Sequence, residues 1–77
     1  MLQVVVGTTL NRTTILVPEN TTLEAAIAQS GIAMPGDDFT LNGIAVKRTR
    51  GELDRTFADY GASGRVNLIA VKQSQNA

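Results

Sequence analysis

The sequence contains no cysteine and no histidine. Without thiols and imidazoles, the chain has no disulfide, no thiolate zinc site, no cysteine nucleophile and no histidine base. A metal site or a general base would have to be built from carboxylates alone. We therefore expect a protein that is not an enzyme and that binds no cofactor and no metal ion.

An excess of charge of either sign is also missing, because seven Lys and Arg residues balance seven Asp and Glu residues. A neutral chain lacks the positive field that draws proteins to nucleic acids or anionic membranes, so we expect it to bind neither. No apolar run approaches about 18 residues, and the first residues, MLQVVVGTT, lack the basic region and apolar length of a signal peptide. These features predict a cytoplasmic protein.

Aromatic residues are few, with Phe39, Phe57 and Tyr60 as the whole set, so the core must be mostly aliphatic. A chain of 8.2 kDa buries roughly 60% of its unfolded surface on folding, which supports one core and no second domain. Its 43% hydrophobic and 18% charged residues are ordinary for a folded protein. We expect a single domain over residues 1–72, followed by a polar tail at residues 73–77.

Two β-branched runs, residues 2–6 and 13–17, begin the chain and predict an amino-terminal hairpin. The linking segment is too long for a two-residue turn, which places Leu10 at an exposed tip. Alternation along the first run places three of its apolar side chains on one face of the sheet. These are Leu2, Val4 and Val6.

Helical spacing replaces this alternation after Pro18, with apolar residues recurring on one face over residues 23–30. Thr21 and Glu24 have the spacing of a capping box, in which the hydroxyl and the carboxylate each satisfy a free amide. Gly31 is placed as the left-handed residue that ends a helix. The pattern predicts one helix of nine or ten residues.

Residues 39–41 and 44–46 flank Asn42 and Gly43, a pair typical of a tight hairpin turn. A single short strand followed by a turn that redirects the chain is the alternative interpretation. Both interpretations place one or two short strands after the helix.

The segment 53–60 carries Leu53, Phe57 and Tyr60 at helical spacing but is too short for a full helix, which predicts a 3₁₀ or single α turn. Residues 66–71 are apolar on both faces except for Asn67. Such a run predicts a strand in the interior of a sheet.

The stretches FTLNGIAV, residues 39–46, and TFADYGASGRVNLIAV, residues 56–71, resemble the carboxyl-terminal half of ubiquitin, and TTLEAA at residues 21–26 resembles its helix start. The resemblance and the order of elements imply an α+β fold of the β-grasp type. We expect a four- or five-stranded mixed sheet, with the first and last strands parallel at its centre and one main helix across it.

The same resemblance implies roles for four residues. Asp59 and Tyr60 would tie their loop to the backbone, and Leu68 and Ala70 would face the helix. Ubiquitin and related sulfur carriers act through a tail that ends in two glycines, whereas residues 71–77 here read VKQSQNA. The chain therefore looks more similar to bacterial ubiquitin-like proteins without that tail.

This similarity implies a non-enzymatic module that binds a partner protein. We expect the chain itself to be a monomer or a weak homo-oligomer, since an uncovered strand edge allows self-association. The expected contact is the outer face of the sheet, or a sheet edge that accepts an added strand. The residues predicted to bind the partner are Thr40, Asn42, Asn67, Ile69 and Val71. The alternative is a sulfur-carrier, modifier-like or nucleic-acid-associated accessory protein.

A second candidate surface is the basic run that contains Lys47, Arg48 and Arg50. Clustered guanidinium groups can hold phosphate, but the run lacks the aromatic residues that stack on bases. A solvated loop is the simpler interpretation. The acidic pairs at residues 37–38 and 52–54 lack the spacing of a metal site, and we expect them to serve in turns.

Overall fold

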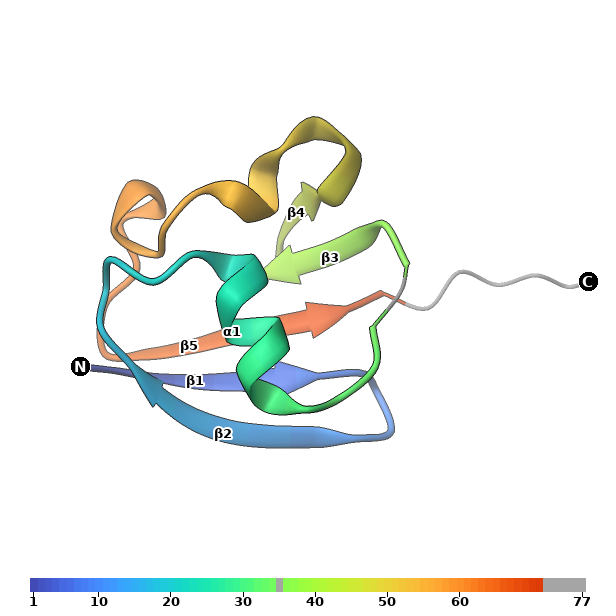
Figure 1. The fold of residues 1–77 in the computed structure, drawn as a ribbon, viewed down its shortest axis with the longest axis horizontal. Coiled ribbons are helices and arrows are strands. Elements are labelled where there is room, and N and C mark those ends of the chain that lie inside the picture. Colours follow the sequence, from blue (N-terminus) through green and yellow to red (C-terminus); the bar gives the residue numbers. More distant parts are fainter. Residues whose placement is uncertain (35, 72–77) are drawn as a thin grey trace, which may run out of the picture.

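The computed structural model describes residues 1–34 and 36–71, which form a five-stranded mixed sheet with one α-helix on one face (Figure 1). The elements are β1 (Leu2–Gly7), β2 (Arg12–Val17), α1 (Leu23–Ser30), β3 (Asp38–Leu41), β4 (Ile44–Lys47) and β5 (Arg65–Ala70). The strand order is β2-β1-β5-β3-β4, with β1 and β5 parallel at the centre. This is the predicted β-grasp arrangement. The predicted polar tail, residues 73–77, lies outside the described residues.

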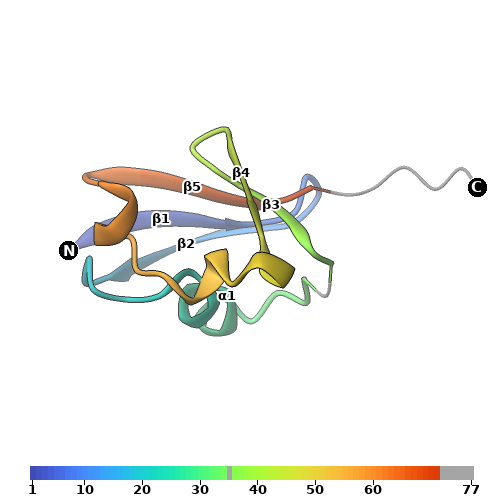
Figure 2. The ribbon, with the colours of Figure 1, turned by 90° about the horizontal axis from the view of Figure 1, so that it is seen from above.

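Three 3₁₀ turns connect β4 to β5: η1 (Arg48–Arg50), η2 (Glu52–Asp54) and η3 (Ala58–Tyr60). The turn structure predicted for residues 53–60 is therefore confirmed. Seen from above, η1 and η2 lie on the same side of the sheet as α1 (Figure 2). We call the opposite side of the sheet the outer face.

The β1–β2 hairpin has the predicted form. Its antiparallel register pairs Leu2 with Val17 and Gly7 with Arg12, and Leu10 at the tip is 84% exposed. The side chains of Val4 and Val6 are fully buried beneath α1. The period-2 pattern of the sequence therefore identified the inner face correctly.

The predicted capping box is wrong, because the helix is capped by Thr22 rather than by Thr21. The Thr22 hydroxyl accepts a hydrogen bond from the Ala25 N–H at 3.1 Å, so Glu24 stands one position too early to complete the box. The tertiary structure selects this threonine, because the first helical amide, of Leu23, donates to the Arg55 carbonyl. The helix is consequently eight residues long, and it ends at Gly31 as predicted.

The Asn42-Gly43 turn is the predicted two-residue hairpin, and the alternative of a single short strand is wrong. Both residues have positive φ, 52° and 86°, as a type I′ turn requires. The turn connects Leu41 directly to its partner Ile44. This geometry matches the right-handed twist of the two strands.

The core lies between the sheet and the helix and is mostly aliphatic, as predicted. Its fully enclosed side chains are those of Phe39, Phe57, Leu23, Leu53, Leu68, Val4, Val6, Val17, Val46 and Val66. Ala70 packs against this cluster from β5, and Tyr60 packs against it from η3. No helix in the described ranges has the length and apolar character needed to cross a membrane.

Candidate functional site

The five residues predicted to bind a partner lie on β3, on β5 and at their ends. The antiparallel register sets Thr40 directly opposite Ile69. The strands continue this pairing at both ends, where the Asn42 N–H donates to the Asn67 carbonyl and the Val71 N–H donates to the Asp38 carbonyl, each at 2.9 Å. The tertiary structure therefore brings the predicted residues together.

Alternation along β5 directs Val66 and Leu68 into the core and Asn67 and Ile69 to the outer face. Val71, just beyond the strand, is 44% exposed. Ile69 is partly exposed, although it lies on an interior strand. The carboxyl end of β5 thus presents apolar surface that α1 does not cover.

Asn42 has a structural role that sequence reasoning missed. Its side-chain Oδ1 accepts the Asn67 N–H at 2.9 Å, in addition to the backbone bond between the same two residues. The side chain replaces the backbone carbonyl that a longer β3 would have supplied. Asn42 therefore extends the β3–β5 ladder.

The β1–β2 loop adds a further apolar residue at this end of the sheet. Gly7 pairs with Ile69, and a Cβ atom at Gly7 would lie 2.0 Å from the Asn11 carbonyl oxygen. The loop that carries the exposed Leu10 therefore begins at the end of the sheet where Ile69 lies. We call Leu10, Thr40, Ile69 and Val71 the Ile69 surface. The hairpin pattern predicted Leu10 at a tip but did not relate that tip to β5, because the β1–β5 register is a tertiary feature.

The predicted basic patch is locally neutralised. Lys47 pairs with Asp38 at 2.5 Å, and this hydrogen bond and charge raise the pKa of Lys47. Arg50 lies 3.8 Å from a carboxylate oxygen of Glu52. Each cation therefore has an acidic neighbour.

Arg48, the third member of that patch, is a structural clamp. Its Nε and Nη2 donate to the two carboxylate oxygens of Glu24 at 3.0 and 3.1 Å. Its Nη1 donates to the carbonyls of Met34 and Gly36, and the guanidinium lies 5.1 Å from the centre of the Phe39 ring. Most of its donors are thus occupied by the protein itself.

The acidic pairs also serve the fold. Asp37 accepts hydrogen bonds from the Thr49 N–H at 2.6 Å and from the Thr49 hydroxyl at 3.1 Å. Glu52 accepts the Lys47 N–H at 2.6 Å. Within residues 1–34 and 36–71, no group of three or more acidic side chains is arranged to hold a metal ion.

Asp59 and Tyr60 tie the loop before β5 to the backbone, as the resemblance implied. Asp59 accepts the Thr56 N–H at 3.0 Å, and this bond, with a second from the Thr56 side chain, lowers the pKa of the Asp59 carboxyl. The Tyr60 hydroxyl donates to the Glu52 carbonyl at 2.6 Å. Burial raises the pKa of the Tyr60 phenol.

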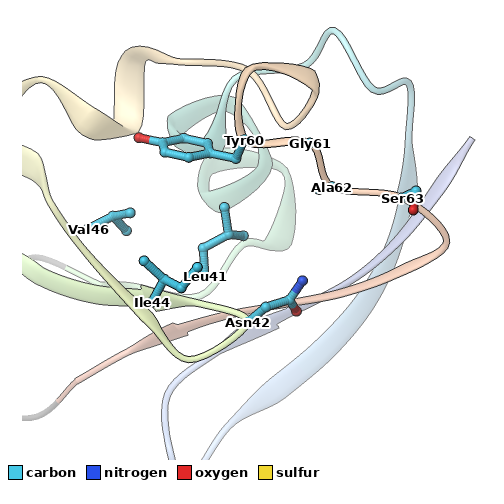
Figure 3. Close-up of a pocket in the computed structure, with 8 residues that line it drawn as sticks. All are labelled: Leu41, Asn42, Ile44, Val46, Tyr60, Gly61, Ala62 and Ser63. Atoms are coloured by element: carbon cyan, nitrogen blue, oxygen red, sulfur yellow. The ribbon is translucent and has the colours of Figure 1, made fainter.

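A shallow groove of about 210 Å³ separates the β3–β4 hairpin from the turn after η3. Leu41 and Val46 lie below the ring of Tyr60, and Ile44 lines the groove beside them (Figure 3). Ile44 is 69% exposed, because it follows the turn at a point beyond the edge of the core. From the sequence, Ile44 was predicted only as a strand residue.

The fold is of the β-grasp type, and exposed apolar side chains lie at one end of its outer sheet face. No family model, curated protein or solved structure matches the chain.

Proposed function

We propose that this chain is a non-enzymatic ubiquitin-like module that binds a partner protein through the Ile69 surface. One observation carries the proposal: Ile69 and Val71 lie on the outer face, with the exposed Leu10 in the adjoining loop. Apolar side chains gathered at one end of an open sheet face are typical of protein contacts. The β-grasp topology supports the ubiquitin-like part of the proposal.

The polar neighbours of this surface suit a protein partner as well. Thr40 stands opposite Ile69, and the exposed Asn42 and Asn67 continue the face toward the β3–β4 turn. Hydroxyl and amide groups around an apolar centre can satisfy a partner's backbone at the rim of an interface. An interface of this kind needs neither a cofactor nor a charged anchor.

The basic loop offers less support for the alternative function. Lys47, Arg48 and Arg50 all have acidic neighbours in the fold, and Arg48 is held by several hydrogen bonds. Recruiting them to phosphate would require these contacts to break. No observation on the described residues favours a nucleic-acid role over the protein contact.

A pull-down from extract of the native host tests the proposal with the purified, tagged chain as bait. We expect Ile69→Asp and Val71→Asp each to lose the captured protein, because a carboxylate would be desolvated in the interface. Ala58→Asp is the matched control, since it adds the same charge at an exposed site on η3. Unfolding midpoints of all variants show whether each remains folded.

The basic loop is tested in the same experiment with Arg50→Glu. Arg50 is suitable because its side chain is 59% exposed, whereas replacement of Arg48 would disrupt the clamp. Capture that survives both outer-face variants but disappears in Arg50→Glu, with a steep dependence on salt, would overturn the proposal.

A further inference from the structure

The outer edge of β2 carries backbone hydrogen-bonding groups that the sheet does not use. The Gln3 N–H donates to the Gly64 carbonyl at 2.9 Å, so Gln3 is bonded toward β5 and not toward its β2 partner Leu16. Along each strand of an antiparallel pair, successive residues direct their backbone N–H and C=O groups alternately toward the partner strand and away from it. The amides and carbonyls of Arg12, Thr14 and Leu16 therefore point away from β1, and no other strand in residues 1–34 and 36–71 pairs with β2.

The two edges of the sheet differ in how they are protected. At the β4 edge, the Glu52 carboxylate accepts the Lys47 N–H, and the chain continues directly into η1. No residue in the described part of the chain caps the β2 edge in this way. Its sequence, RTTILV, contains no lysine and no proline, and its register with β1 runs without a bulge. Edges that avoid pairing carry such devices, and Arg12 at the start of β2 is the one charged side chain on this strand.

We propose that β2 pairs antiparallel with β2 of a second copy of this chain, about a two-fold axis at Thr14. Thr14 then exchanges both backbone hydrogen bonds with its counterpart, and Arg12 exchanges them with Leu16 of the second copy. All the outward backbone groups of these three residues are satisfied at once. The zero net charge of the chain leaves no overall repulsion between the copies.

Neighbouring registers satisfy fewer groups. An axis moved toward Leu16 sets Arg12 or Thr14 against Pro18, which has no N–H to donate. An axis moved toward Arg12 sets Leu16 against the loop of residues 8–11 instead of a strand. The register centred on Thr14 is therefore the one that satisfies the outward backbone groups of all three residues.

Side chains agree with this register. Leu16 is 63% exposed on the outer face, and it would lie beside Arg12 of the second copy, whose aliphatic stem can cover it. No two like charges stand opposite each other. The axis is perpendicular to the sheet, so both helices lie on one side and both Ile69 surfaces on the other. The dimer thus goes beyond the proposed function, and either can fail without the other.

Sedimentation of the whole chain over a wide concentration series tests the proposal. We expect the mass to rise from 8.2 kDa toward twice that value as concentration increases. In parallel, amide exchange at Thr14 and Leu16 should slow with concentration, while exchange at Thr13 and Ile15, which bond to β1, stays constant. A mass that remains at 8.2 kDa throughout would overturn the proposal.

Two charge variants of one residue test the register. Leu16→Lys sets a cation against Arg12 of the second copy and should weaken the dimer at least tenfold, whereas Leu16→Glu sets an anion there and should retain it. Both variants place a charge at the same exposed site, so loss of apolar surface alone would affect them equally. Equal weakening of the dimer by both variants would refute the register.

Cross-linking gives an independent measure, because the chain has no cysteine of its own. Thr14→Cys places two thiols at the axis, where Cα atoms about 5.5 Å apart suit a disulfide. Leu16→Cys is the matched control, since its two copies lie far apart in this register. Oxidation should cross-link the first variant and leave the second monomeric in a denaturing gel, and the reverse result would contradict the proposal.

Discussion

Arg48 and Glu24 stand 24 positions apart in the sequence and meet through two parallel hydrogen bonds of 3.0 and 3.1 Å. The pair joins η1 to the first turn of α1, where a carboxylate also complements the helix dipole. The same guanidinium holds the carbonyls of Met34 and Gly36. One side chain therefore ties η1 both to the start of α1 and to the segment that connects α1 to β3.

Arg48→Ala should lower the free energy of unfolding by about 2 kcal/mol, because it removes a forked ion pair and two bonds to carbonyls. The expected change in the free energy of unfolding is modest because solvent partly screens both side chains. Arg50→Ala is the control and should change stability by less than about 0.5 kcal/mol. Urea denaturation measures both, and equal effects would show that Arg48 is an ordinary surface residue.

Thr22→Ala should destabilise the protein by about 1 kcal/mol, since it removes the hydroxyl that caps α1 through the Ala25 N–H. Thr21→Ala removes a neighbouring hydroxyl that takes no part in the cap and should have a smaller effect. Thermal or urea unfolding of the two variants compares them directly. A larger loss for Thr21→Ala would restore the capping box that the sequence suggested.

Leu68→Ala should cost on the order of 3 kcal/mol, because Leu68 is fully buried on the central strand β5. The adjacent Asn67→Ala changes a side chain on the exposed face and should cost much less. Urea midpoints provide the comparison. An unchanged midpoint for Leu68→Ala would mean that the inner face of β5 has been assigned incorrectly.

Asp59→Asn should flatten the dependence of stability on pH in acid. The hydrogen bonds from Thr56 lower the pKa of the folded carboxyl below its ordinary value of 3.8. The carboxylate therefore stabilises the protein above pH 3.8, and this contribution is lost as the pH falls through the lowered value. The urea midpoints of the wild type and the variant should therefore converge as the pH falls through this range. Parallel curves would show that Asp59 makes no such contribution.

Tyr60 should titrate above its ordinary pKa of 10.0 in the folded protein, because burial disfavours the phenolate. It is the only tyrosine and the chain has no tryptophan, so ultraviolet absorbance reports this one group. The same titration in denaturant should return to the ordinary value. Identical curves in the two states would contradict the burial of the phenol.

The sequence by itself determined the order and kind of the elements, because local rules suffice for them. Period-2 alternation identified the inner face of β1, the Asn42-Gly43 pair predicted the tight hairpin turn, and Gly31 marked the end of α1. Each of these features depends on residues a few positions apart.

Only the tertiary structure decided which of two threonines caps the helix, what Arg48 does, and where Leu10 lies. The Arg55 carbonyl selects Thr22 by receiving the first helical amide. The partners of Arg48 lie on α1 and in the loop before β3, far from Arg48 in the sequence. The basic run that contains Arg48 was therefore predicted to be a solvated loop. Each outcome depends on long-range packing and register, which local propensity does not encode.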